Sequence, residues 1–128
     1  MADIKKPILV LSTFPEGVSA KDTAECLVNE KLAACVNIIP GVQSIFRWQD
    51  KIDNSNENIL IIKTTNNLYS KLENRIKELH PYELPEIISV SIENGLPEYL
   101  NWINKNEKFD NKKKRGMYDI AKSIIENR

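Results

Sequence analysis

Alternating apolar and polar residues between positions 35 and 51 form the most regular pattern in the chain. The even positions carry the larger apolar side chains: Val36, Ile38, Val42, Phe46 and Trp48. Alternation with a period of two predicts a long β-strand that buries one face. Pro40 and Gly41 interrupt the run, and because proline has no N–H to donate, we expect a bulge at this point.

A second apolar run, from Ile59 to Thr65, predicts a return strand, and the polar residues Asp53–Asn56 predict the turn before it. The return strand is apolar on both faces, so both faces need a cover. At about 3.3 Å per residue, a first strand of about 17 residues approaches a length of about 55 Å. A compact chain of this size has a diameter of about 36 Å. The hairpin is longer than its own domain, which predicts that other chains cover it.

Shorter patterns predict the elements of the first half. Pro7–Phe14 is a nearly continuous apolar strand of the kind found in the centre of a sheet. Ser19 with Asp22 three positions later predicts a capping box and a helix that starts there. The apolar face expected for this helix consists of Ala20, Ala24, Leu27, Val28 and Leu32.

The second half predicts another helix and another strand. Asn66 or Asn67 is expected to cap the helix, which ends at His80 because the residue before Pro81 is pushed out of the helical region. Its apolar side chains are Leu68, Leu72, Ile76 and Leu79. The last strand is predicted at Glu86–Ile92.

The predicted order is β-α-β-β-α-β, followed by a short helix from Pro97. This order is typical of an α+β ferredoxin-like sandwich, in which two helices cover one face of a four-stranded sheet. Here a long hairpin joins the second and third strands. We predict a flexible N-terminus at 1–6 and the ferredoxin-like domain at 7–104. At 105–128 we predict a charged linker and a C-terminal amphipathic helix with apolar residues at 117, 120, 121, 124 and 125.

Composition narrows the classes of partner. The 18 basic and 18 acidic residues cancel, so no overall field favours nucleic acid or a membrane surface. The basic run Lys112–Arg115 is interpreted as a solvated linker. No apolar run reaches the roughly 18 residues of a membrane span, and the run Ile8–Leu11 is too short for a signal peptide. We therefore expect a soluble cytoplasmic protein that binds neither nucleic acid nor membranes. Its two cysteines make no disulfide framework.

The residue types and their spacing do not predict catalysis. An RNA-recognition module needs aromatic residues on its central strands, and the strands here carry none. An acylphosphatase-like enzyme needs an arginine-bearing loop after the first strand, whereas Thr13–Gly17 is acidic. A nucleophilic hydrolase needs histidine beside Cys or Ser, and His80 is the one histidine in the chain.

Several blocks of sequence, taken together, resemble one known family. They are Leu32–Asn37, Ile39–Val42, Ser44–Phe46, Trp48, Glu57, Ile62–Thr64, His80–Glu83, Pro85–Ile87, Tyr99–Leu100 and Trp102–Ile103. The chain resembles the CutA divalent-cation-tolerance family over roughly residues 8 to 103. The LAACVN and HPYExPEI blocks carry most of the specificity.

The resemblance implies a ferredoxin-like homotrimer with a PII-like assembly, in which the hairpins pack across subunits. It implies a role in tolerance of copper and other divalent metals, without established enzymatic activity. A metal site has been proposed in the family at positions matching Cys35 and His80. This chain departs from the family pattern at three positions: Ser12 replaces a cysteine found in some members, Phe46 replaces tyrosine and Asp50 replaces glycine. We therefore expect copper(II) or another divalent cation to bind weakly.

Each candidate site residue also has a structural interpretation. Cys35 is either a small buried hydrophobe or a metal ligand, and His80 either caps carbonyls at its helix end or binds a metal. Lys63 needs an anionic partner, either an interface carboxylate or a bound anion. The candidate partners are Glu57, Tyr82, Glu83 and Glu86. Trp48 either packs at an interface or stacks on a ligand.

The committed hypothesis is a trimeric, non-enzymatic protein that responds to a divalent metal or a small ligand. The ligand-binding candidates are Trp48, Glu57, Lys63, Tyr82 and Glu86, with Cys35 and His80 as metal candidates. One alternative is an enzyme or PII-like signalling module with a small-anion site between subunits around Lys63, Tyr82 and His80. Another is a structural trimer that presents the 105–128 helix to a partner.

Overall fold

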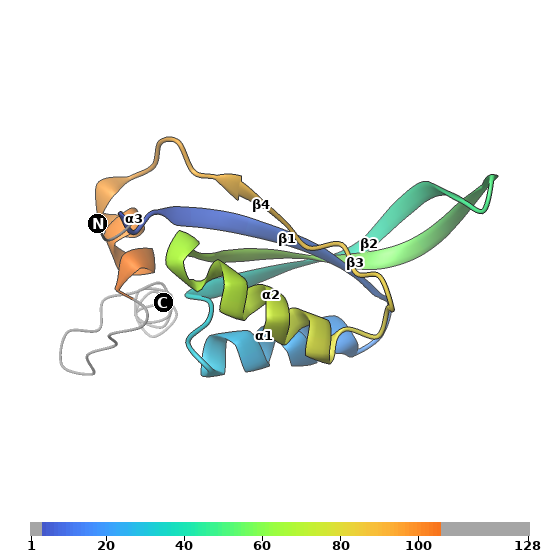
Figure 1. Ribbon diagram of the computed structural model, residues 1–128, viewed down its shortest axis with the longest axis horizontal. Helices are drawn as coiled ribbons and strands as arrows, with labels where there is room; N and C mark the ends of the chain where they lie inside the picture. The colour runs from blue at the N-terminus through green and yellow to red at the C-terminus, as the bar shows by residue number, and fades with distance from the viewer. Residues whose placement is uncertain (1–3, 106–128) are drawn as a thin grey trace, which may run out of the picture.

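A four-stranded antiparallel sheet with helices on both of its faces forms the structure, a computed structural model that describes residues 4–105 (Figure 1). The strand order is β2-β3-β1-β4. The strands are β1 (Pro7–Pro15), β2 (Cys35–Trp48), β3 (Lys51–Thr65) and β4 (Ile88–Ser91). The helices are α1 (Ser19–Asn29), the short 3-10 helix η1 (Asn66–Leu68), α2 (Tyr69–Leu79) and α3 (Pro97–Asn104). The predicted α+β class and β-α-β-β-α-β order are confirmed, including the central position of the first strand.

The main core lies between the sheet and the helices α1 and α2. Strand β1 pairs with β3 along its whole length, from Pro7 opposite Thr65 to Pro15 opposite Glu57. Every second residue of β1 is buried, as the period of a strand requires. The core side chains are Ile8, Val10, Phe14, Ala20, Ala24, Leu27, Ala33, Leu60, Ile62, Leu72 and Ile76.

The long hairpin of β2 and β3 extends past the helices, as Figure 1 shows. The predicted bulge is confirmed, because the register shifts between Ile39 and Val42. Gly41 has a φ of 70°, a left-handed conformation that glycine adopts without steric cost. The strands remain paired on both sides of the bulge.

The predicted hairpin turn at Asp53–Asn56 is wrong. These residues belong to β3, and the chain reverses at Gln49 and Asp50, whose φ angles are 48° and 65°. A two-residue hairpin turn needs positive φ at both central positions, and Asp tolerates this better than most residues. The tighter turn lets Trp48 pair with Lys51, so the ladder continues to the end of the hairpin.

The predicted helix caps are also wrong, although the first helix starts where expected. Val18 occupies the cap position of α1, and the buried Ser19 hydroxyl has no hydrogen-bond partner among the described residues. Asn66 binds the N-terminal segment instead of capping α2: its Oδ1 accepts from the Lys6 N–H at 2.8 Å and its Nδ2 donates to the Ile4 carbonyl at 3.1 Å. Tertiary partners replaced the local ones here.

Three further boundaries differ from the prediction. Val28 is 42% exposed and faces away from the core, and Leu32 lies beyond the end of α1. β4 is only four residues long, because its pairing with β1 runs only from Ile88 opposite Leu11 to Ser91 opposite Ile8. The amphipathic helix predicted near the C-terminus lies outside the described residues. Within residues 4–105, no helix is long and apolar enough to cross a membrane.

Candidate functional site

His80 lies where α2 ends, and its ring is held between β1 and the segment that follows. The ring Nδ1 accepts a hydrogen bond from the Tyr82 backbone N–H at 3.0 Å, so Nε2 carries the proton and donates to the Thr13 carbonyl at 2.8 Å. The ring stacks on Phe14 with centroids 4.0 Å apart. The expected capping of helix carbonyls by this ring is wrong, because its bonds join α2 to β1.

Burial keeps the His80 ring neutral. Desolvation lowers the pKa of His80 below its usual value, and this outweighs the opposing effects of the Thr13 carbonyl and the Glu57 carboxylate. Both ring nitrogens are already used in hydrogen bonds. A metal ion at Nδ1 has to displace the Tyr82 amide.

Tyr82 and Glu57 form a second contact in the same region. The Tyr82 hydroxyl donates to Glu57 Oε2 at 2.7 Å, and the Glu57 residue is only 7% exposed. Burial, together with the bond to Glu57, raises the pKa of Tyr82 to about 12. Tyr82 therefore stays a hydrogen-bond donor at physiological pH and ties the segment after α2 to β3.

Cys35 and Lys63 lie elsewhere, on the sheet face opposite α1 and α2. They are directly paired across β2 and β3, and paired residues of antiparallel strands share a face. The Lys63 Nζ donates to the Tyr99 hydroxyl at 3.0 Å and lies 5.3 Å from the centroid of that ring. The Cys35 thiol lies 3.9 Å from the Asn37 side-chain oxygen.

The structure therefore divides the predicted site residues into two groups. Glu57 precedes Lys63 by six positions in β3, which corresponds to about 20 Å along the strand. The predicted pairing of Lys63 with Glu57 or Tyr82 is wrong, because Lys63 binds Tyr99. Sequence analysis missed Tyr99, although an interior-strand lysine beside a helix carrying Tyr99 and Trp102 was an available signal.

The other candidates lie apart from both groups. Trp48 is 57% exposed and flanks the hairpin turn, opposite Lys51. Glu86 and Glu83 are exposed in the segment between α2 and β4. Across residues 4–105, no three His, Cys, Asp or Glu side chains come close enough together to hold a metal ion.

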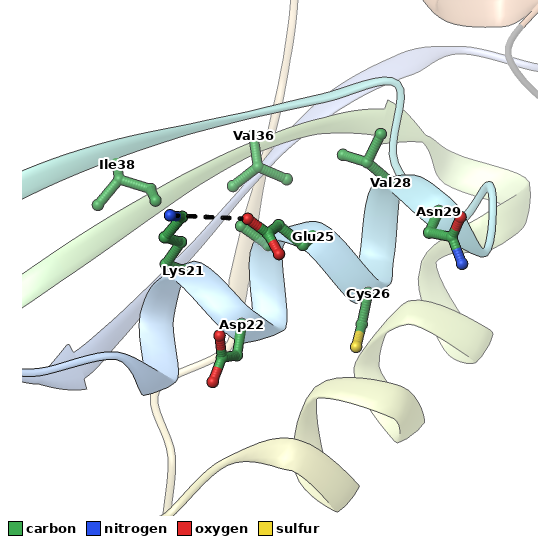
Figure 2. A pocket seen from close by; sticks show the side chains of 9 residues that line it. Lys21, Asp22, Glu25, Cys26, Val28, Asn29, Val36 and Ile38 are labelled. Carbon is green, nitrogen blue, oxygen red and sulfur yellow. Dashed lines mark ion pairs between the residues drawn. The ribbon is translucent and has the colours of Figure 1, made fainter.

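An open groove runs between α1 and the edge strand β2, and Figure 2 shows its lining. Lys21 and Glu25 form an exposed ion pair of 3.9 Å on the helix, while Val36 and Ile38 project from the strand. Cys26 points away from the two strand residues (Figure 2). The lining has no convergent set of polar groups, so it identifies no ligand chemistry.

Comparison with known proteins accounts for most of the described chain. Residues 8–106 match the sequence model of the family described as CutA1 divalent ion tolerance protein. The chain belongs to the CutA family. The resemblance inferred from the sequence blocks is thereby confirmed.

Individual relatives share both sequence and fold. The divalent-cation tolerance protein CutA of Thermus thermophilus is 47% identical over 98 residues, which are 77% of this chain and 95% of the relative. Its crystal structure matches with a TM-score of 0.77 at 46% identity, covering 78% of this chain and 97% of the other. CutA1 of Oryza sativa matches with a TM-score of 0.77 at 39% identity, covering 79% and 93%.

A third relative differs in its described location. The CutA structure of Archaeoglobus fulgidus, 36% identical with a TM-score of 0.75, covers 78% of this chain and 97% of its own, and is described as a periplasmic divalent cation tolerance protein. CutA relatives are thus named for tolerance of divalent cations.

Proposed function

We propose that this CutA chain acts as a homotrimer in tolerance of, or response to, divalent metal ions, copper among them, without catalysis. The match over residues 8–106 to proteins named for this tolerance carries the proposal. We place the protein in the cytoplasm, with neither nucleic acid nor membrane as a partner.

The exposed apolar surface of one chain supports self-association. Ile45 and Ile52, near the end of the hairpin, are 71% and 73% exposed, and Ile88 and Val90 on β4 are about half exposed. Contiguous apolar surface of this kind marks an interface in soluble proteins. A second copy is the natural cover, because relatives of this family share the same hairpin sequence blocks.

The strand order supports a closed ring. β2 and β4 are the two outer strands, so each chain has one unpaired edge on either side of its sheet. Unpaired edges promote uncontrolled association unless they are covered. Pairing the β2 edge of one chain with the β4 edge of the next is a head-to-tail contact, which closes when the rotation between chains is one third of a turn. The PII-like assembly follows this geometry.

A resident metal ion does not fit the described residues of a single chain. His80 has both nitrogens in hydrogen bonds, and Cys35 lies beside the Lys63 ammonium, which repels a cation. The two residues also lie apart: His80 contacts Thr13, which pairs with Ile59, whereas Cys35 pairs with Lys63 four positions later in β3. Copper(II) or another divalent cation therefore binds weakly, at separate single ligands.

The same separation bears on the alternatives. Lys63 does not share a site with Tyr82 and His80 within one chain, so no observation favours an enzyme built around these three residues. The scaffold alternative depends on the 105–128 tail, most of which lies outside the described residues. We retain the non-enzymatic proposal.

Growth on copper tests the proposed role. Expression of this chain in a bacterium that lacks its own CutA should restore growth at elevated Cu²⁺. A trimer-disrupting variant, Trp48→Asp, should not restore it. Failure of the wild-type chain, produced at a normal level, contradicts the proposed role.

Calorimetric titration with Cu²⁺ tests the metal ligands. We expect weak binding that His80→Ala and Cys35→Ser each reduce further, whereas Cys26→Ser leaves it unchanged. Equal affinities of the wild type and His80→Ala remove His80 from the site.

A further inference from the structure

Lys63 occupies an unusual position for a charged residue, in the interior strand β3. It faces Cys35 on one side and Leu9 on the other, and Leu9 in turn faces Val90 of β4. These residues form a row across the sheet on the face opposite α1 and α2. Helix α3 packs against β1 and β3 on this face, so the Lys63 side chain is half-buried beneath it.

The Lys63 ammonium lacks a carboxylate partner in the part of the chain that is described. Its nearest polar group is the Tyr99 hydroxyl at 3.0 Å, and no acidic oxygen of residues 4–105 is recorded within 4.0 Å. The half-buried Arg75, by contrast, binds Glu30 through two nitrogens at 2.9 Å each. A partly desolvated cation is costly without an anion, so Lys63 has capacity for one.

Neighbouring groups add further donors around the ammonium. A lysine ammonium has three N–H groups, of which Tyr99 accepts one. Because the Tyr99 oxygen accepts from Lys63, its own O–H is available to donate. On β2, the Asn37 side-chain oxygen lies 3.9 Å from the Cys35 thiol, which leaves the Asn37 amide N–H groups as donors on the same face. The cluster contains more donors than acceptors, which is complementary to an oxyanion.

We propose that Lys63, Tyr99 and Asn37 form a binding site for a small oxyanion, the phosphate or carboxylate group of a small molecule, on the sheet face opposite α1 and α2. Lys63 supplies the charge, and the Tyr99 and Asn37 groups orient the oxygens. Trp102, whose ring lies 5.5 Å from that of Tyr99, forms a flat wall beside the site. This site shares no residue with the cluster of His80, Tyr82 and Glu57 and does not rest on the proposed role of a metal.

Calorimetric titration of the full chain tests the site. Inorganic phosphate and malonate are the two probes, each added at constant ionic strength, and the tighter of the two identifies the group that the site prefers. We expect saturable binding of at least one probe. Lys63→Gln should weaken it by about tenfold or more, because it removes a charge-assisted hydrogen bond. Lys21→Gln, which removes an exposed lysine on α1, should leave the affinity unchanged.

A second variant and a second measurement keep the test independent of folding. Tyr99→Phe keeps the ring packed on Lys63 and removes only the hydroxyl, so it should fold and weaken binding severalfold. In a Trp48→Phe background, Trp102 is the remaining tryptophan, and its fluorescence should change as the probe binds. The absence of saturable binding of either anion to the wild type overturns the proposal. An equal affinity of wild type and Tyr99→Phe, or an equal loss in Lys21→Gln, also overturns it.

Discussion

The Tyr82 hydroxyl donates a 2.7 Å hydrogen bond to the buried carboxylate of Glu57, 25 positions earlier in the chain. This contact joins the segment after α2 to β3, beside the stacked rings of His80 and Phe14. Its energetic importance follows from the carboxylate, because a buried charge that loses its donor retains its full desolvation cost.

Tyr82→Phe should therefore destabilise the protein by about 1–3 kcal/mol. Tyr69→Phe is a matched control, because Tyr69 also donates at 2.7 Å to a glutamate, but Glu73 is less buried than Glu57. Its loss should be smaller, since water can replace the donor. Urea denaturation of both variants measures the difference, and equal losses contradict the special cost at Glu57.

The stability should also fall at high pH because of Tyr82. Its pKa is raised to about 12 in the folded protein, above the value of about 10 in the unfolded chain. The unfolded state therefore loses this proton first, so the contribution is complete below pH 10 and disappears as pH rises towards 12. Denaturation midpoints across this range should fall more steeply for wild type than for Tyr82→Phe. Parallel curves contradict the assignment.

His80 should make the protein less stable in acid. Its pKa is lowered by burial, so between the folded and unfolded values the unfolded chain binds the extra proton. The contribution is present above about pH 6.5 and is lost as pH falls through the folded pKa. Glu57 is the charged group that opposes this shift. Midpoints measured from pH 8 to pH 5 should decrease in wild type and be flatter in His80→Gln; an unchanged slope counts against the prediction.

Asp50→Gly should stabilise the hairpin. Asp50 has a φ of 65°, a conformation that costs a residue with a Cβ up to about 1–2 kcal/mol, less for Asp than for most. We expect a gain of roughly 0.5 kcal/mol in the free energy of unfolding and a loss for Asp50→Ala, which lacks a polar side chain to support the turn. Thermal unfolding of the three proteins gives the order directly, and a more stable Ala variant reverses the explanation.

Trp48→Asp should break the assembly. Light scattering should give the wild type a mass near three times the 14.7 kDa chain, even at nanomolar concentration, because the apolar hairpin and both sheet edges are covered only in the trimer. The matched control is Val18→Asp, which changes another exposed apolar residue, 72% accessible at the start of α1. That variant should keep the wild-type mass. A folded, well-behaved wild-type monomer is incompatible with the proposed assembly.

Local rules were sufficient for much of the fold. The bulge at Pro40 and Gly41 and the end of α2 before Pro81 follow from the geometry of proline and glycine alone. The apolar period of two predicted β2, and the periods of the helices predicted α1 and α2. The sequence blocks that resemble CutA were enough to identify the family, since they cover most of the domain.

The site depended on contacts between distant positions. Ser19 and Asn66 are good caps in isolation, but tertiary packing and the N-terminal segment determined what each of them contacts. The turn lies at Gln49 and Asp50 because the pairing of β2 with β3 continues to Trp48, a property of two strands that neither strand encodes alone.

By itself, the sequence determined the order of the elements, the long hairpin, the family and the residue types available for chemistry. Only the tertiary structure decided that Lys63 meets Tyr99, 36 positions later, and that His80 is occupied by Thr13 and Tyr82. The physical reason is that a side chain's partners depend on sheet register and helix placement. Both are set by the joint packing of the whole core, and patterns of a few residues do not contain them.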